Sequence, residues 1–227
     1  MSDQMKTYPV LNIKSHSPVM KSFYFRQPEP DIQPGRFFNV WLPGVDEKPF
    51  SVSDVFQGIM EITVKAVGPF TRKLMDVRRG DLLGLRGPFG RGFSHYQHAL
   101  LVGGGMGIVP LRYLARQLRQ RGFHFEVLLG GRCRQDISFQ TDFSDYSSGP
   151  EAMLVKVMDL AAQAGLDYEI SFERYMKCGI GICGQCVVDG SGIRLCKEGP
   201  VLSRQEAEKV SEWGMPHRDA TGRRNNS

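Results

Sequence analysis

Residues 178–196 read CGIGICGQCVVDGSGIRLC and contain four of the five cysteines of this 227-residue chain. Glycine stands between most neighbouring cysteines, at Gly179, Gly181 and Gly184. Because glycine has no Cβ atom and adopts positive φ angles without strain, a backbone rich in it can wrap closely around a compact group. We therefore expect these residues to form an irregular, loop-rich unit that brings four thiols together.

The four cysteines have the spacing C-x4-C-x2-C-x9-C and are Cys178, Cys183, Cys186 and Cys196. Three cysteines at C-x4-C-x2-C with a distant fourth is the plant-type spacing for the ligands of a [2Fe–2S] cluster. Such a cluster needs thiolates that converge on two irons and backbone N–H groups that approach its sulfides, and glycines permit that approach. The pattern predicts that these four cysteines are iron ligands.

Two other roles for clustered cysteines remain as alternatives. A structural zinc ion is usually held by C-x2–4-C pairs at both ends of the motif, whereas this segment has one C-x2-C pair. Disulfides form in oxidising compartments, but the start, MSDQMKTYPV, has no apolar stretch like that of a secretory signal. The fifth cysteine, Cys133, stands alone in GGRCRQD and is expected to be an ordinary half-buried residue.

The composition is typical of a globular protein with many turns, with 41% hydrophobic residues, 26 glycines and 13 prolines. The net charge is +5, yet no block of five like charges occurs, so a nucleic-acid partner is not expected. No run approaches the ~18 apolar residues that a membrane helix needs. We expect a soluble, cytoplasmic protein without a membrane partner.

The pattern of apolar residues changes near residue 98. Before it, short runs separated by Pro and Gly breaks predict a small closed antiparallel barrel, and these runs are FYFRQ, FFNVWL, MEITVKAV and DLLGLRG. After it, HALLVGGG reads as a buried parallel strand, IVPLRYLARQLRQRG as a helix and FHFEVLLGGR as the next strand. These three segments make a βαβ unit.

The predicted fold is therefore an N-terminal antiparallel β-barrel, a shortened α/β nucleotide-binding domain and a C-terminal loop domain. The expected bounds are residues 1–97 for the barrel, 98–168 for the α/β domain, 169–212 for the cysteine unit and 213–227 for a flexible tail. A further helix is expected in MLVKVMDLAAQAG, just before the cysteine unit.

Three segments of the barrel part have the residues to bind a charged, planar ligand: KPFSVS, GPFTRKL and GPFGRGF. A cation, a rigid turn and two hydroxyls in the first could hold a pyrophosphate and the edge of a flavin. The second presents free N–H groups at the start of a short helix. Each segment alone also has a structural explanation, and Thr71 is a typical helix-capping residue.

GGGMG, residues 103–107, follows a predicted strand and opens a predicted helix. Small residues at a strand end, followed by a helix N-terminus, favour the binding of a phosphate. The segment is not a strict G-x-G-x-x-G, so a tight strand–helix turn is the alternative.

In their order along the chain, these motifs resemble those of the electron-transfer subunit of NAD-linked (class 1B) dihydroorotate dehydrogenase, in the ferredoxin–NADP reductase superfamily. KPFSVS resembles that family's R-P-x-S flavin motif, GPFTRKL its second pyrophosphate segment and GPFGRGF its barrel-closing turn. LLVGGGMGIVPL resembles its nucleotide loop, SSGPEAML its C-G-P-x-x-M segment and CGIGICGQC…C its cluster loop. Related subunits of hydrogenases, transhydrogenases and glutamate-synthase-like systems share most of these motifs.

The resemblance implies three bound groups, which are FAD, a [2Fe–2S] cluster and NAD. The implied FAD contacts are Lys48, Pro49, Phe50, Ser51, Val52, Ser53, Lys65, Val67, Gly68 and Thr71. The implied NAD contacts are Gly103, Gly104, Gly105, Gly107, Gly149 and Pro150. The implied partner is an FMN-containing dihydroorotate dehydrogenase catalytic subunit, in a heterotetramer. No residue is predicted to act as a catalytic acid, base or nucleophile.

The sequence departs from the family pattern at three places. Lys48 stands where the family usually has arginine, which keeps the charge but loses the bidentate fork. Ser148 stands where the family usually has cysteine. The connection over residues 136–149 is short, whereas family members usually carry a further strand and helix there. We expect a smaller parallel sheet as a result.

The three implied groups fit one task. NAD accepts a hydride, a [2Fe–2S] cluster carries one electron at a time and FAD handles both, so FAD is expected to lie between them. The predicted function is electron transfer from dihydroorotate oxidation, in pyrimidine biosynthesis, through the cluster and FAD to NAD⁺. The alternatives are the same cofactors serving a hydrogenase, transhydrogenase or glutamate-synthase-like complex, and a non-enzymatic, zinc-stabilised binding module.

Four apolar or aromatic residues accompany the cysteines: Tyr175, Met176, Ile180 and Ile182. Exposed apolar groups around a redox centre are typical of a docking surface. The alternative is that they shield the cluster from water.

Overall fold

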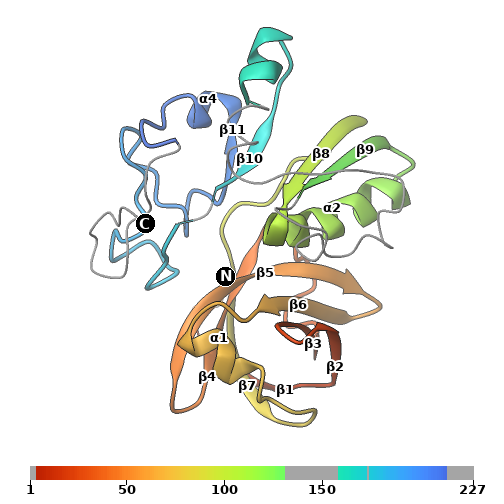
Figure 1. Cartoon of the computed structure of the whole chain (residues 1–227), viewed down its shortest axis with the longest axis vertical. Helices are drawn as coiled ribbons and strands as arrows, with labels where there is room; N and C mark the ends of the chain where they lie inside the picture. Colours follow the sequence, from red (N-terminus) through yellow and green to blue (C-terminus); the bar gives the residue numbers. More distant parts are fainter. Residues whose placement is uncertain (1–3, 131–157, 173, 214–227) are drawn as a thin grey trace.

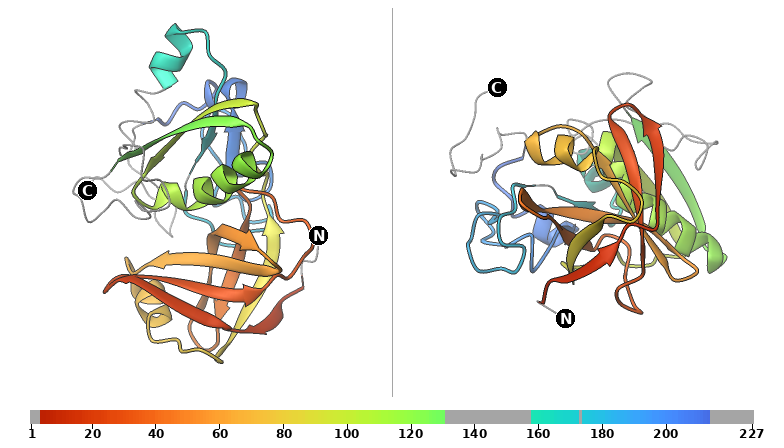
Figure 2. Two further views of the ribbon diagram at one scale, coloured as in Figure 1. Left: turned by 90° about the vertical axis from the view of Figure 1, so that its right-hand side faces the viewer. Right: turned by 90° about the horizontal axis from the view of Figure 1, so that it is seen from below.

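The computed structural model describes residues 4–130, 158–172 and 174–213, shown in colour in Figure 1. A β-barrel-like sheet forms one end of the molecule, and the α/β unit and the cysteine unit lie on it at the other end (Figures 1 and 2). The predicted fold class and the order of its three parts are confirmed. No helix in the described ranges is long and apolar enough to cross a membrane.

The N-terminal part is one seven-stranded antiparallel sheet in the order β1-β7-β4-β5-β6-β3-β2. Its strands are β1 (Lys6–Pro9), β2 (Asn12–Ser17), β3 (Met20–Arg26), β4 (Phe37–Leu42), β5 (Asp46–Phe56), β6 (Ile59–Lys65) and β7 (Leu82–Phe89). A short helix, α1 (Pro69–Leu74), joins β6 to β7. No ladder joins β1 to β2 among the described residues, so the sheet is a half-barrel and the predicted closure is wrong.

The half-barrel is held together by an aromatic and aliphatic core. Phe23, Phe25, Phe38, Met60 and Ile62 are each at most 1% exposed. They come from three strands on which apolar and polar residues partly alternate, as expected when one face of a curled sheet is buried. Burial of a side chain of this size contributes about 1.5–3 kcal/mol each, so this core supplies a rigid platform.

The α/β unit contains β8 (His98–Gly104), the 3₁₀ turn η1 (Gly105–Gly107), α2 (Ile108–Gln120) and β9 (His124–Gly130). β8 and β9 pair in parallel, from His98↔His124 to Gly104↔Gly130, which confirms the predicted βαβ unit. The helix covers one face of the two strands with residues spaced three or four apart, which are Ile108, Leu111, Leu114, Ala115 and Leu118.

The cysteine unit is bounded by a small antiparallel pair, β10 (Glu169–Ser171) and β11 (Val201–Ser203), followed by α4 (Arg204–Ala207). The segment between the two strands is irregular, as the glycine-rich sequence predicted. Trp213, which the sequence placed in a flexible tail, instead packs edge-on against Phe172 at a centroid distance of 4.4 Å. Its indole N–H also donates to the Ala207 carbonyl at 2.9 Å, so Trp213 belongs to the cysteine unit.

The cysteine unit is tied to the end of the half-barrel by Arg91. Its Nε donates to the Val201 carbonyl at 3.0 Å, and its guanidinium group also pairs with Glu206. The Arg91 hydrogen bond is the largest influence on the Glu206 carboxyl group and lowers its pKa to about 2. Glu206 further accepts from the Ser203 backbone at the start of α4, so one carboxylate links both parts.

Helix α2 is anchored to the half-barrel by buried charges. Arg112 Nη1 lies 2.6 Å from Glu61 Oε2, and Arg116 Nη2 lies 2.6 Å from Asp54 Oδ2. Both carboxylate residues are only 4% exposed. Burial raises the pKa of Asp54, and the two guanidinium groups act in the opposite direction. The position of α2 on β5 and β6 therefore depends on the pairing of these arginines with the two buried carboxylates.

Arg112→Met is expected to lower the free energy of unfolding by about 3–5 kcal/mol, because Glu61 would keep a buried charge without its closest counter-ion. Urea denaturation followed by circular dichroism measures the loss. Arg121→Met, at the exposed end of the same helix, is the control and should cost under ~1 kcal/mol. Equal losses in the two variants would contradict the assigned role of Arg112.

Candidate functional site

The four clustered cysteines are free thiols that span the surface and the interior of the cysteine unit. Cys186 and Cys196 are each 2% exposed, Cys178 is half-buried and Cys183 is exposed. The disulfide alternative therefore finds no support among these four residues. Cys133 lies outside the described residues.

The sulfur atoms are arranged as two pairs. The Cys183 N–H donates to Cys178 Sγ at 3.5 Å, and the Cys196 N–H donates to Cys186 Sγ at 3.4 Å. Within each pair the two thiols also form a hydrogen bond. No three His, Cys, Asp or Glu side chains in the described ranges converge on a point that could hold one metal ion.

Hydrogen bonds favour the thiolate form of Cys178 and Cys186. Burial raises the pKa of Cys178, but N–H donors of Cys183, Ile180 and Ile182 outweigh burial and lower it to about 6. The thiol of Cys196 donates to Cys186, which lowers the pKa of Cys186 to about 7 and raises that of Cys196. Because the thiolate is the form that binds metals, the loop is prepared for ligation.

A third backbone donor shows why glycine is needed here. The Gly181 N–H donates to Cys196 Sγ at 3.1 Å, with Gly181 at φ +79°. A Cβ atom at this position would lie 2.8 Å from Lys197 Cδ. The predicted use of glycine, for positive φ and for close approach, is thus what the structure shows.

Arg194 contacts the backbone of the loop and a neighbouring carboxylate. Its Nη1 donates to the Gly181 carbonyl at 2.9 Å, and its Nε donates to Glu198 Oε2 at 3.1 Å. The sequence analysis did not identify this pair, although the i,i+4 spacing of an arginine and a glutamate is a recognisable signal.

The KPFS residues lie on β5, at the side of the half-barrel that faces the cysteine unit. Lys48 Nζ lies 2.5 Å from Asp46 Oδ2 and 5.6 Å from the centroid of the Tyr175 ring. The Phe50 ring stacks on Phe70 of α1 at 6.0 Å. The structure therefore brings together two of the segments predicted to bind flavin, and it places the cysteine unit beside them.

Val52 and Ser53, two of the predicted flavin contacts, have buried side chains. Both residues are 0% exposed, and Val52 belongs to the barrel core. The Ser53 hydroxyl donates to Thr63 Oγ1 at 2.8 Å inside the sheet. Their side chains thus point away from any ligand on the surface, and only their backbone can face one. The alternation of side chains along a strand predicts a buried side chain for one of the two residues. The β-bulge between Val52 and Asp54 interrupts that alternation and buries both.

Thr71 organises the turn before α1. Its Oγ1 accepts the N–H groups of Val67 and Gly68, each at 2.9 Å, and donates to the Gly68 carbonyl at 3.1 Å. Val67 is 73% exposed and Lys65, at the end of β6, is half-buried. The turn thus presents an accessible edge, and the capping role expected for Thr71 is confirmed.

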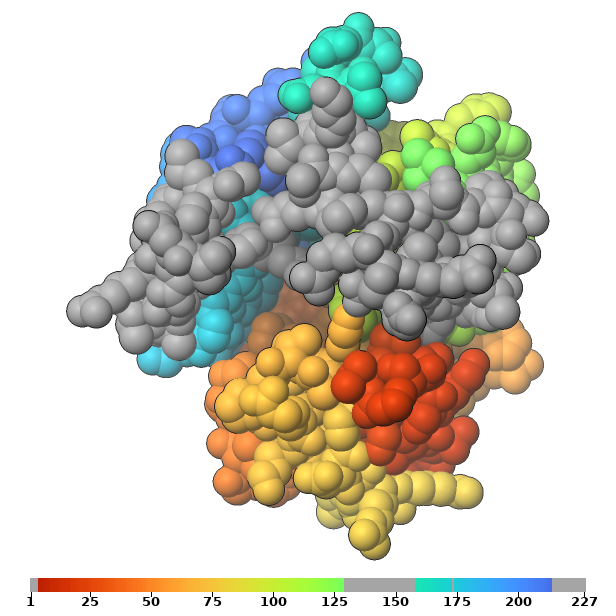
Figure 3. All heavy atoms as spheres, in the orientation of Figure 1, coloured from red at the N-terminus to blue at the C-terminus, as the bar shows by residue number. Residues whose placement is uncertain are grey.

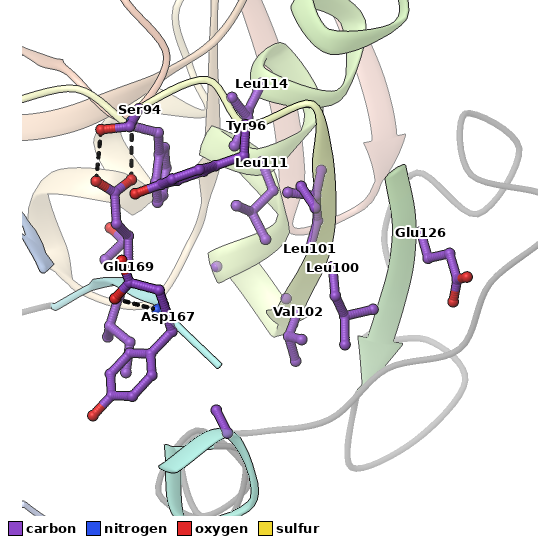
Figure 4. Close-up of a pocket in the computed structure, with 18 of the residues that line it drawn as sticks. Ser94, Tyr96, Leu100, Leu101, Val102, Leu111, Leu114, Glu126, Asp167 and Glu169 are labelled. Carbon is purple, nitrogen blue, oxygen red and sulfur yellow. Dashed lines mark hydrogen bonds between the residues drawn. The ribbon is translucent and has the colours of Figure 1, made fainter. Parts of the chain in front are cut away.

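The predicted nucleotide loop borders a cavity of about 750 Å³ between the α/β unit and the cysteine unit. Gly103, Gly104 and Gly107 line it at the end of β8 and the start of α2. Figure 4 shows the apolar wall, made by residues such as Leu101 and Leu111. Gly149 and Pro150, the other predicted nucleotide contacts, lie outside the described residues, as does Ser148.

A polar wall stands opposite the leucines. Glu169 of β10 accepts from the Ser94 N–H at 2.9 Å and from the Ser94 hydroxyl at 2.8 Å (Figure 4). Tyr96 lies beside them. An apolar cavity with a few fixed polar groups is typical of a site for a small molecule or a cofactor.

Comparison with known proteins identifies the family. The chain is 33% identical to the probable dihydroorotate dehydrogenase B (NAD(+)) electron transfer subunit of Methanocaldococcus jannaschii, over 95% of this chain and 96% of that one. The chain belongs to the family of dihydroorotate dehydrogenase B electron transfer subunits. The corresponding protein of Methanothermobacter thermautotrophicus is 36% identical over 98% of each chain. Residues 173–208 match the iron-sulfur cluster binding domain of dihydroorotate dehydrogenase B.

Solved structures confirm the reductase fold of this family member. A structure of the NADH-dependent reduced ferredoxin–NADP oxidoreductase, from work on flavin-based electron bifurcation, has a TM-score of 0.74 at 24% identity. That match covers 91% of this chain and 90% of the other. Phthalate dioxygenase reductase, which transfers electrons from pyridine nucleotides to [2Fe–2S], has a TM-score of 0.62 at 19% identity, covering 70% and 65%.

This subunit is shorter than its relatives within the aligned region. The two alignments run over 251 and 263 positions, whereas the chain has 227 residues, so the relatives contain stretches that it lacks. The sequence analysis predicts that the missing stretch corresponds to the short 136–149 connection. That connection lies outside the described residues.

Gly179→Ala is expected to destabilise the loop far more than Gly192→Ala. Both glycines have positive φ, +72° and +70°, so both variants incur a backbone cost of about 1–2 kcal/mol. A Cβ at Gly179 would also lie 2.3 Å from Asn39 Nδ2, whereas one at Gly192 meets nothing within 4 Å. Iron content and thermal unfolding of the two variants measure the difference. Similar values for the pair would show that the close approach at Gly179 is unimportant.

Proposed function

We propose that this subunit passes electrons from a partner flavoenzyme through a [2Fe–2S] cluster and FAD to NAD⁺. The observation that carries the proposal is the direct contact between the cysteine unit and β5, the strand with the KPFS motif. In Figure 3 the light-blue cysteine unit lies against the orange strands of the half-barrel. Two redox groups bound at these places would be neighbours.

The cysteine loop fits a two-iron cluster. A [2Fe–2S] cluster takes two protein ligands on each iron, and the thiols form the two pairs Cys178/Cys183 and Cys186/Cys196. When bound, the cluster supplies one-electron transfer. The loop's own contribution is to hold four thiolates and to direct N–H groups, such as that of Gly181, toward them.

Lys48, Pro49, Phe50 and Ser51 of β5, with the Thr71 turn, are the residues that would hold FAD. When bound, FAD supplies the exchange between one-electron and hydride transfer. Lys48 would place a positive charge beside the pyrophosphate, and Phe50, stacked on Phe70, would fix the strand edge against which a planar ring lies. The exposed edge at Val67 and Gly68 leaves room for the rest of the dinucleotide.

The cavity at Gly103, Gly104, Gly105 and Gly107 is the proposed site for NAD. Its volume of about 750 Å³ lies within the range of cofactor sites. The glycine-rich turn before α2 would let a phosphate approach the backbone at the helix N-terminus. The cavity's leucine wall would exclude water from a nicotinamide ring.

We propose an FMN-containing dihydroorotate dehydrogenase catalytic subunit as the partner, in a heterotetramer. The relatives are electron transfer subunits of dihydroorotate dehydrogenase B (NAD(+)), by their names. Cys183 is exposed and Ile182 is 79% exposed, so one edge of the cysteine loop is open to a docking protein. Met176, by contrast, is 9% exposed and belongs to the core of the unit, so it shields the loop instead.

A second candidate is the same cofactor chain in another complex. The ferredoxin–NADP oxidoreductase structure shares the fold over nearly the whole chain. A ferredoxin or an NADP-linked partner would then replace the dihydroorotate dehydrogenase.

Reconstitution tests the proposal. The anaerobically purified subunit is expected to contain about two irons and one FAD per chain, and its visible absorption should bleach on addition of NADH. With the FMN-containing catalytic subunit it should support dihydroorotate-dependent reduction of NAD⁺. A colourless protein would overturn the cofactor assignment, and a loaded subunit that works only with ferredoxin would favour the second candidate.

Cys186→Ser is expected to lose most of the bound iron, because Cys186 is a buried member of its pair and serine is a weak ligand for iron in such a cluster. Iron analysis and visible absorption measure the loss. Cys133→Ser makes the same chemical change outside the four-cysteine motif and should keep the full iron content. Retention of iron by Cys186→Ser, or its loss from Cys133→Ser, would refute the ligand set.

A further inference from the structure

Two side chains of the half-barrel bind the backbone of the first cysteine in the loop. Asn39 Nδ2 donates to the Cys178 carbonyl at 3.3 Å, and Arg86 Nη2 donates to the same oxygen at 3.1 Å. Asn39 precedes Cys178 by 139 positions and Arg86 precedes it by 92. Neither residue belongs to a motif, so the sequence alone does not reveal these contacts. One carbonyl thus receives two hydrogen bonds from another part of the fold.

The two donors belong to the same row of the sheet as the KPFS motif. Asn39 on β4 is directly opposite Arg86 on β7 and directly opposite Pro49 on β5. Adjacent strands of a sheet lie about 4.8 Å apart. The Cys178 backbone is therefore bonded to residues that lie one strand (Asn39) and two strands (Arg86) away from Pro49 of the proposed flavin strand.

Charge pairing fixes the Arg86 side chain in this position. Its Nε donates to Glu47 Oε1 at 3.0 Å, and its Nη2 lies 2.5 Å from the same oxygen. The Arg86 side chain is 17% exposed and that of Glu47 is 25% exposed, so both are largely shielded from water. A guanidinium group held by a carboxylate of β5 has little freedom, and its Nη2 also donates to the Cys178 carbonyl of the loop.

Asn39 packs closely against Gly179 of the loop, in addition to its hydrogen bond with the Cys178 carbonyl. Asn39 is 1% exposed, and a Cβ on Gly179 would lie 2.3 Å from its Nδ2. Its Oδ1 is buried without a hydrogen-bond partner in the part of the chain that the structure describes. Burial of an unsatisfied amide oxygen costs about 1–3 kcal/mol, so a purely structural role would be served better by an apolar residue.

We propose that Asn39 and Arg86 are positioning residues that lock the cysteine loop onto the flavin strand and thereby fix the path of electrons between the two cofactors. The inference rests on the proposed function, because it requires that the loop holds a cluster and the strand a flavin. Arg86 also places a positive charge beside the first ligand. Arg86 is paired with Glu47, so a neutral residue in its place would leave the Glu47 carboxylate unpaired beside the cluster loop. Reduction adds negative charge to a cluster, so that change is expected to lower the cluster's reduction potential.

The test compares Arg86→Met, Arg86→Lys and Asn39→Ala with the wild-type subunit, and Arg26→Met is the matched control at the exposed end of β3. Iron and FAD content are measured first. An EPR-monitored titration then gives the cluster potential, and stopped-flow spectroscopy gives the rate at which NADH-reduced FAD passes an electron to the cluster.

Arg86→Met is expected to lower the cluster potential and to slow electron transfer by roughly tenfold or more, because small displacements of reacting groups have large effects on rate. Arg86→Lys keeps the charge but loses the fork, so the potential should be retained while the rate still falls. Asn39→Ala should slow the transfer and leave the potential nearly unchanged. Arg26→Met should match the wild type in every measurement.

The outcomes separate this inference from the proposed function. A wild-type subunit without iron or FAD would overturn the proposed function itself. A loaded wild type, with Arg86→Lys and Asn39→Ala variants that transfer electrons at the wild-type rate, would overturn the positioning role. If Arg86→Met binds no cluster, Arg86→Lys and Asn39→Ala still decide the question through their rates and potentials.

Discussion

The cysteine loop has almost no regular secondary structure, so its shape must be imposed from outside. Four thiols lie within about twenty residues, and as thiolates they repel one another. The structure offsets that repulsion with N–H groups of the loop itself and with two arginines, Arg86 of the half-barrel and Arg194 of the cysteine unit. The chemistry of the loop therefore depends on a rigid neighbour.

Strand β5 is the element that links the three parts of the molecule. Its first half carries Glu47, which holds Arg86, and Lys48, which lies over Tyr175 of the cysteine unit. Its second half carries Asp54, which pairs with Arg116 of α2. Pro49, Phe50 and Ser51, the rest of the KPFS motif, lie between these two contacts. A substitution in β5 is therefore expected to affect the proposed flavin, cluster and nucleotide sites together.

Much of this arrangement could be predicted from local sequence. The spacing of the cysteines and the glycines between them indicated the loop, and apolar periodicity indicated the βαβ unit. Long-range features could not be predicted in this way. The bulge that buries Val52 and Ser53, the packing of Trp213 and the contacts of Asn39 and Arg86 all arise from residues distant in sequence. The open edge between β1 and β2 could not be predicted either. Strands with alternating apolar and polar residues are compatible with both closed and open sheets.

The separation of Asn39 and Cys178 along the chain has a consequence for the biogenesis of the holoprotein. The carbonyl that anchors the loop meets its donors only after β4 and β7 are paired, and closing so long a segment is entropically costly unless those strands are already in place. We therefore expect the proposed cluster to be assembled late, on a preformed sheet. Until then the thiols remain open to oxidation, so the folding of the N-terminal half limits how long they are vulnerable.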